Sequence, residues 1–174
     1  MKKIDFFLSI ILLITTVSAY GQNTKSGIQA KDSINSVLDA FHKAAADADF
    51  DAYFDFFAEN AVFMGTDASE RWPVKDFKVW CKPHFDRKKT WHFSALQRHV
   101  TVDASGHLAW FDELLDTQMK ICRGSGVLVK LGGEWKVSQY VLSMTIPNEK
   151  SDSVIQIKAP LEEEIIEFLK EKKE

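Results

Sequence analysis

Residues 91–145 alternate between apolar and polar side chains, and this period of two constrains the fold more than any other feature of the chain. Turn-forming residues divide the stretch into four runs, at residues 91–102, 107–119, 121–131 and 134–145. Gly132 and Gly133 separate the last two runs and are typical of a two-residue hairpin turn. Gly124 and Gly126 interrupt the third run, where glycine often marks a bulge or bend. The pattern therefore predicts four long antiparallel strands in a bent sheet that curls around an interior.

The part of the chain before residue 91 predicts helices. Asp32 or Ser33 can cap a first helix, because apolar residues recur after them at spacings of three and four. The segments expected next are a second, shorter helix capped by Asp49, a strand at residues 61–64, and a third helix between Pro73 and Pro83. The predicted fold class is α+β, with N-terminal helices packed on a strongly bent antiparallel sheet.

The N-terminal residues predict export. Lys2 and Lys3 precede an apolar run at residues 6–17, and small residues follow at Ala19 and Gly21, as in a cleaved signal peptide. The run is shorter than the roughly 20 apolar residues that a spanning helix needs. We interpret residues 1–21 as a signal peptide and expect a periplasmic or secreted protein with no membrane contact after cleavage.

The rest of the chain is interpreted as a lead-in, one domain and a C-terminal helix. Residues 22–31 are polar and predict a flexible lead-in. Residues 32–147 are long enough for a single domain with one core. Residues 148–174 predict a polar linker followed, from Pro160, by an amphipathic helix with acidic residues first and basic residues last.

The charge of the chain argues against nucleic-acid binding. The formal net charge is −3, and the only dense basic cluster is Arg87, Lys88 and Lys89. A protein that binds nucleic acid needs a positive surface that neutralises several phosphates. We therefore expect no nucleic-acid partner.

Neither a metal nor a cofactor is predicted. Four histidines lack the close spacing of zinc motifs: His84, His92, His99 and His107. No glycine-rich loop lies between a strand and a helix, where it would hold the phosphates of a cofactor. Cys81 and Cys122 would either form a disulfide in an oxidising compartment or remain two buried thiols, and the sequence leaves that choice open.

Four short sequence motifs, in this order and spacing, resemble the SnoaL-like branch of the nuclear-transport-factor-2-like superfamily. They are Gly65-Thr66-Asp67 with Glu70 and Trp72, Ala109-Trp110-Phe111-Asp112-Glu113, Arg123-Gly124-Ser125-Gly126-Val127-Leu128, and Gly133-Glu134-Trp135-Lys136-Val137. The resemblance implies a cone-shaped fold whose interior forms a pocket. Relatives include cyclases, an isomerase, dehydratases and plain binding modules, so it implies a scaffold and not one activity. Many relatives carry histidines on the last strand, where this chain has Gln139 and Val141.

Asp112 and Glu113 are the candidate catalytic residues. Neighbouring residues on a regular strand point to opposite faces, so one of the two carboxylates faces the interior. An apolar cavity raises the pKa of a carboxyl group, which suits a general acid or base. The alternative is a structural ion pair with Arg123 on the adjacent strand. His42 lies beside the apolar face of the first helix and is interpreted as a satisfied edge residue.

The ligand-binding prediction combines rim residues with residues of the strands. On the last strand, the face that carries Trp135 and Gln139 is predicted to point inward. The complete predicted set is Asp67, Glu70, Trp72, Trp110, Arg123, Trp135 and Gln139.

Two functions follow from this reading. The first is an exported protein that binds a small apolar or aromatic molecule in a tryptophan-rich pocket. The alternative is a cofactor-independent isomerase, cyclase or dehydratase in which the inward carboxylate moves a proton. The sequence leaves open whether the protein is an enzyme, and whether it pairs as a homodimer.

Overall fold

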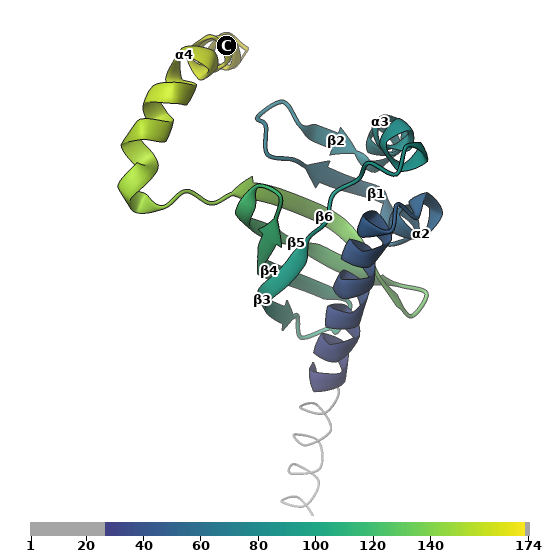
Figure 1. Cartoon of the computed structure of the whole chain (residues 1–174). Coiled ribbons are helices and arrows are strands. Elements are labelled where there is room, and N and C mark those ends of the chain that lie inside the picture. The colour runs from purple at the N-terminus through teal and green to yellow at the C-terminus, as the bar shows by residue number, and fades with distance from the viewer. Residues whose placement is uncertain (1–26, 173–174) are drawn as a thin grey trace, which may run out of the picture. The chain divides into compact units, whose positions relative to one another are not determined.

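The computed structural model describes residues 27–172, which divide into two compact units with the boundary after Ser143. The first unit begins with a helix at residues 27–46. The elements that follow are α2 (Phe50–Asp55), β1 (Phe57–Met64), β2 (Arg71–Pro73), α3 (Val74–Asp86), β3 (Ser94–Val102), β4 (Leu108–Thr117), β5 (Lys120–Leu131) and β6 (Glu134–Met144) (Figure 1). The mixed α+β architecture predicted from the sequence is confirmed.

The strands form one six-stranded sheet in the order β2-β1-β6-β5-β4-β3. β4 pairs antiparallel with both β3 and β5, and β1 pairs antiparallel with β2 but parallel with β6. Gly132 and Gly133 connect β5 to β6 with φ angles of 58° and 93°, which glycine adopts at little cost. Each of the four long strands ends within three residues of its predicted bounds.

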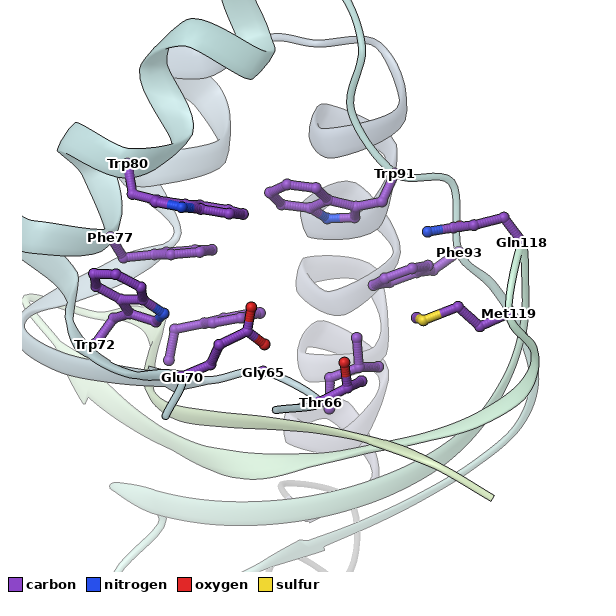
Figure 2. Close-up of a pocket in the computed structure, with 12 residues that line it drawn as sticks. Gly65, Thr66, Glu70, Trp72, Phe77, Trp80, Trp91, Phe93, Gln118 and Met119 are labelled. Atoms are coloured by element: carbon purple, nitrogen blue, oxygen red, sulfur yellow. The ribbon is translucent and has the colours of Figure 1, made fainter. Parts of the chain in front are cut away.

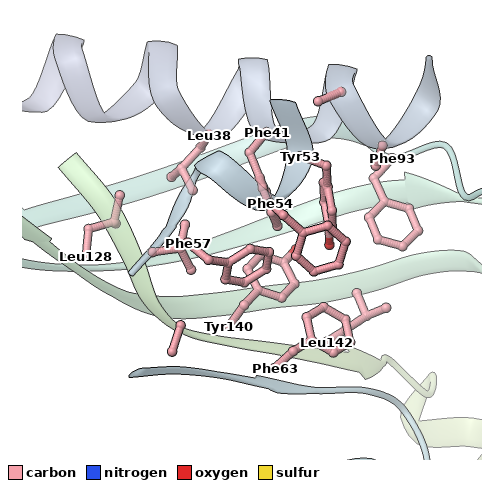
Figure 3. Packing of buried hydrophobic residues seen from close by; sticks show 14 of the residues in the cluster. Leu38, Phe41, Tyr53, Phe54, Phe57, Phe63, Phe93, Leu128, Tyr140 and Leu142 are labelled. Atoms are coloured by element: carbon pink, nitrogen blue, oxygen red, sulfur yellow. The ribbon is translucent and has the colours of Figure 1, made fainter. Parts of the chain in front are cut away.

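Burial alternates along β4, so the concave face of the sheet can be read residue by residue. Ala109, Phe111, Glu113 and Leu115 point into the core, while Trp110 and its neighbours of the same parity lie on the outer face. The helix at residues 27–46 covers the concave face, and its Leu38 and Phe41 meet aromatic side chains from α2 and the sheet (Figure 3).

The alternation on β6 slips by one residue in its middle. Trp135 and Val137 are buried, Gln139 is exposed, and Tyr140 is buried again. The pairing of β1 with β6 is irregular at the same place. The prediction of one continuous inward face through Trp135 and Gln139 is therefore wrong. Gly126 makes the slip possible, because a Cβ at this position would lie 2.1 Å from the carbonyl oxygen of Gln139.

The bounds of the first helix, β1 and α3 differ from the sequence prediction. β1 begins at Phe57, four residues before the predicted strand at residues 61–64. The first helix is already formed at residue 27, inside the expected lead-in, and no proline interrupts residues 27–46. Pro83 lies within α3, which continues to Asp86. β2 was not predicted, since three residues are too few to show a period. The predicted signal peptide, residues 1–21, lies outside the described residues.

The second unit contains a 3-10 turn, Asn148–Lys150, and one long helix, α4 (Ser151–Glu171). The expected linker before Pro160 is thus helical. Pro160 lacks the N–H that would donate to the preceding turn, and on an exposed helix water can satisfy the freed carbonyl. Within residues 27–172, the structure contains no helix with the length and apolar character to cross a membrane.

Candidate functional site

A pocket with a volume of about 140 Å³ opens between α3 and the segment that precedes β3 (Figure 2). One wall is made by Trp72 of β2 with Phe77 and Trp80 of α3. The opposite wall is made by Trp91 and Phe93, together with Gln118 and Met119 from the turn between β4 and β5. The remaining lining residues are Phe63, Gly65, Thr66, Glu70 and Leu142.

The first wall is a set of nearly parallel aromatic rings. Phe77 and Trp80 are three residues apart on α3, so both project from the same side of the helix. The Phe77 ring lies 4.0 Å from that of Phe63 at an interplanar angle of 7°, and 6.0 Å from that of Trp80 at 14°. Trp72 lies 6.0 Å from Trp80 at 29°. A pocket with parallel aromatic planes along one side suits a flat apolar guest.

Polar groups gather at the loop between β1 and β2. Glu70 is half-buried, and its Oε2 accepts a hydrogen bond from the backbone N–H of Asp67 at 3.2 Å. Gly65 leaves room for this carboxylate, because a Cβ there would lie 2.1 Å from Glu70 Oε2. Asp67 itself is exposed and accepts hydrogen bonds from the hydroxyl and the N–H of Ser69, which lower the pKa of its carboxyl group.

The structure brings two of the seven predicted ligand-binding residues to this pocket, Glu70 and Trp72. Asp67 lies in the same loop but does not line the space. Trp110, Arg123 and Gln139 are exposed on the outer face of the sheet, so their prediction as pocket residues is corrected.

Trp135 is buried at 4% exposure but does not line the pocket, and Lys130 Nζ lies 5.7 Å from its ring centroid. The pocket tryptophans that the prediction missed are Trp80 and Trp91. The helical spacing of Phe77 and Trp80 indicated a shared face, but not that this face borders a pocket.

The inward carboxylate of the β4 pair is Glu113, which has 0% exposure. Its Oε1 accepts hydrogen bonds from His42 Nε2 at 2.7 Å and from the Tyr140 hydroxyl at 3.2 Å. Its Oε2 accepts one from Arg98 Nε at 2.7 Å. An ionised carboxylate only accepts, so the Nε2 of His42 carries the proton. We call these four residues the Glu113 cluster.

Arg98 links the cluster to the surface of the first helix. Its Nη1 donates to Asp39 Oδ1 at 2.8 Å and to the carbonyl oxygen of Asn35 at 3.2 Å. Gly124 of the neighbouring strand provides the space, because a Cβ there would lie 2.5 Å from the Tyr140 hydroxyl and 2.8 Å from Glu113 Oε1.

The environment of Glu113 favours its charged form. Burial raises the pKa of this carboxyl group, but the hydrogen bond and charge of His42, together with those of Arg98, outweigh burial and lower it. Burial and the neighbouring Glu113 raise the pKa of the Tyr140 hydroxyl. Both oxygens of Glu113 are thus occupied, and Glu113 does not line the aromatic pocket.

Asp112 and Arg123 lie on the opposite face. Asp112 Oδ1 is 3.5 Å from His99 Nδ1 and 3.9 Å from Arg123 Nη1, and about half or more of each side chain is exposed. The predicted partnership between the inward acid and Arg123 is therefore wrong, because Arg123 pairs across the outer face while Arg98 supplies the buried charge. His42, which was given no role, is 5% exposed and is bonded directly to Glu113.

Within residues 27–172, no group of three or more His, Cys, Asp or Glu side chains is arranged to hold a metal ion. Cys81 and Cys122 are both free and buried. Burial raises the pKa of the Cys81 thiol, which disfavours its reactive thiolate form.

Comparison with known proteins supports the fold. No curated protein matches the chain. A nuclear-transport-factor-2-like protein from Pseudomonas putida superposes with a TM-score of 0.57 at 17% identity, covering 71% of this chain and 92% of the other. A Nostoc punctiforme domain with a cystatin-like fold gives 0.59 at 12% identity, covering 83% and 97%. A Pectobacterium atrosepticum protein gives 0.56 at 13%, covering 68% and 92%.

Identities this low show the shared fold alone. The family relationship comes from a sequence model, described as the SnoaL-like domain, that matches residues 34–147. This range includes every residue of the aromatic pocket and of the Glu113 cluster. The chain belongs to the SnoaL-like domain family.

Proposed function

We propose that this protein binds a small apolar or aromatic molecule in the pocket walled by Trp72, Trp80 and Trp91. The observation that carries the proposal is the pocket itself, half of whose twelve lining residues are aromatic. Isolated exposed aromatic residues are common on proteins, but several around one concave space are typical of ligand sites.

The size of the pocket supports a guest with one ring. Its volume is about 140 Å³, and an engineered apolar cavity of about 150 Å³ in another protein stays dry and binds benzene. A flat ring would lie along the parallel planes of Phe77 and Trp80, where offset stacking adds to the burial of apolar area. Substituents would extend toward solvent, because the pocket is partly open.

The proposal is tested by titrating the full chain with benzyl alcohol and following tryptophan fluorescence. Trp91→Leu should weaken the affinity severalfold, because it removes part of one wall. Trp110→Leu, which makes the same change on the outer face at 48% exposure, should leave the affinity unchanged. Equal affinities for the two variants, or no saturable response, would contradict the proposal.

Export is part of the proposal and rests on the sequence of residues 1–21. Its test is expression of the whole chain in a bacterial host, followed by fractionation and mass measurement of the mature N-terminus. Loss of about the first 21 residues together with recovery outside the cytoplasm is the expected result. An uncleaved protein in the cytoplasm would refute export without affecting the pocket.

The catalytic alternative receives less support. A general base needs a lone pair within reach of substrate, and both oxygens of Glu113 are occupied by His42, Tyr140 and Arg98. Asp112 lies on the outer face, away from the pocket. Catalysis through either carboxylate remains a prediction, and so does the homodimer, which light scattering after size exclusion would test.

A further inference from the structure

We propose that the natural occupant of the aromatic pocket is an organic cation, a single-ring or similarly compact apolar body that carries a protonated amine. This inference rests on the proposed function, because it assigns a ligand class to the same pocket. Its starting point is Glu70, which within residues 27–172 is the only charged residue that lines the space. Among the residues that the structure describes, no lysine, arginine or histidine lines the pocket.

The carboxylate of Glu70 has no cationic partner within residues 27–172. Its one hydrogen bond, from the N–H of Asp67 to Oε2, leaves Oε1 without a bonded partner in the described part of the chain. An acid beside an aromatic surface loses part of its hydration without gaining a counter-charge. A bound cation would supply that counter-charge.

The loop aims the carboxylate at the pocket. Gly65 lies beneath it, and the missing Cβ leaves the space that Glu70 Oε2 occupies. Figure 2 shows the carboxylate pointing into the space between the wall of Trp72 and Phe77 and the wall of Phe93 and Met119. An amine placed there would meet Oε1 while its apolar body lies between the walls.

The aromatic residues favour the same class of ligand. Tryptophan faces attract cations through the ring quadrupole, more strongly than phenylalanine or tyrosine faces. Trp72, Trp80 and Trp91 all border the pocket. An anionic ligand would instead meet the carboxylate of Glu70. The pocket therefore discriminates by charge as well as by shape.

The test compares three probes with the same ring, benzylammonium, benzyl alcohol and benzoate, at pH 7 and low salt. Benzylammonium should bind about tenfold more tightly than benzyl alcohol, the factor expected for one hydrogen bond to a charged group, and benzoate should bind most weakly. Added salt should weaken the binding of benzylammonium and leave that of benzyl alcohol unchanged.

Two variants isolate the role of Glu70. Glu70→Gln should lower the affinity for benzylammonium about tenfold and change that for benzyl alcohol less than about twofold, which also shows that the pocket is intact. Glu59→Gln makes the same change at an exposed position of β1 and should affect neither probe. Gly65→Ala should act like Glu70→Gln, because its Cβ displaces the carboxylate.

The outcomes separate the two proposals. If benzyl alcohol and benzylammonium bind equally and Glu70→Gln changes neither, the inference is overturned and the pocket proposal stands. If none of the three probes binds, the pocket proposal fails and the inference fails with it. A preference for benzylammonium that is lost in Glu70→Gln but kept in Glu59→Gln supports both.

Discussion

Replacing Glu113 with glutamine should destabilise the protein by about 3 kcal/mol at pH 7, as worked from the three hydrogen bonds that the carboxylate accepts. Oε2 faces Arg98, while Oε1 faces both His42 and Tyr140. The glutamine amide has only one oxygen, which is best placed to accept the hydrogen bond from Arg98. The NH₂ group of the glutamine then faces His42 and Tyr140, which both donate to the carboxylate in the wild type.

The magnitude follows from burial. A buried donor without an acceptor costs about 1–3 kcal/mol, and breaking a buried ion pair costs about 3–5 kcal/mol. The expected loss lies near the lower end of the ion-pair range, about 3 kcal/mol, because the partners of Glu113 can compensate. His42 can change tautomer, the Tyr140 oxygen can accept a hydrogen bond, and Arg98 keeps its bond to Asp39. The loss would be a large share of a typical stability of about 5–15 kcal/mol.

The effect should also depend on pH. The pKa of Glu113 is lowered in the folded protein from its ordinary value of 4.5, so its stabilising contribution is full above that value. It is lost as the pH falls through the lower folded-state pKa. The difference in unfolding free energy between the wild type and Glu113→Gln should therefore be constant from pH 7 down to about pH 5 and should shrink at more acidic pH.

The assay is urea denaturation followed by tryptophan fluorescence at several pH values. Asp112→Asn is the matched control, one residue away on the outer face, and should cost less than about 0.5 kcal/mol because its ion pairs are exposed and long. A larger loss for Asp112→Asn than for Glu113→Gln would refute the assignment of the two faces.

Three further predictions concern other parts of the first unit. Gly126→Ala should destabilise by about 1–3 kcal/mol, measured by thermal and urea unfolding, because its Cβ would collide with the backbone oxygen of Gln139; unchanged stability would contradict the close approach. Cys81 and Cys122 should resist thiol reagents in the native protein and react after unfolding, as followed by mass spectrometry; fast native labelling would contradict their burial. Asp103 should titrate near pH 2 by carboxyl NMR, because it accepts hydrogen bonds from the Ser105 hydroxyl and from backbone N–H groups; an ordinary value would show that these bonds are not formed in solution.

The positions of the strands could be predicted from the sequence because the alternation of apolar and polar residues is a local property. The alternation of apolar and polar residues placed the four long strands within a few residues of their true bounds. It also reduced the candidate acids to Asp112 and Glu113. The structure then selects Glu113, because its neighbours on β4 of the same parity are the buried ones.

The partners of Glu113 could not be predicted from the sequence because they depend on register over long distances. His42 is 71 residues away along the chain and Tyr140 is 27 residues away. Arg98 faces Glu113 only because β3 and β4 pair in one register, with an irregularity between Ala95 and Gln97. A shift by one residue would have placed a different side chain opposite the acid.

The tryptophans of the pocket were misassigned for a related reason. Trp110 and Trp135 belong to recognisable sequence motifs, but a strand has two faces, and only one of them borders the interior. The slip at Gln139 also breaks the parity on which the prediction for β6 depended. Trp80 and Trp91 lie outside those motifs. Trp80 is on α3, and Trp91 was predicted to begin a strand but precedes β3, so alternation did not place it beside the pocket.

The Glu113 cluster makes the sheet and the first helix depend on each other during folding. One carboxylate on β4 is bonded to side chains from the helix, from β3 and from β6. Without the docked helix, Glu113 would lose its imidazole partner, and the apolar residues of the concave face would stay exposed to water and forfeit the free energy of their burial. The helix and the sheet should therefore fold together. Shortened chains that lack residues 27–46 should expose apolar surface and aggregate instead of forming a stable folded fragment.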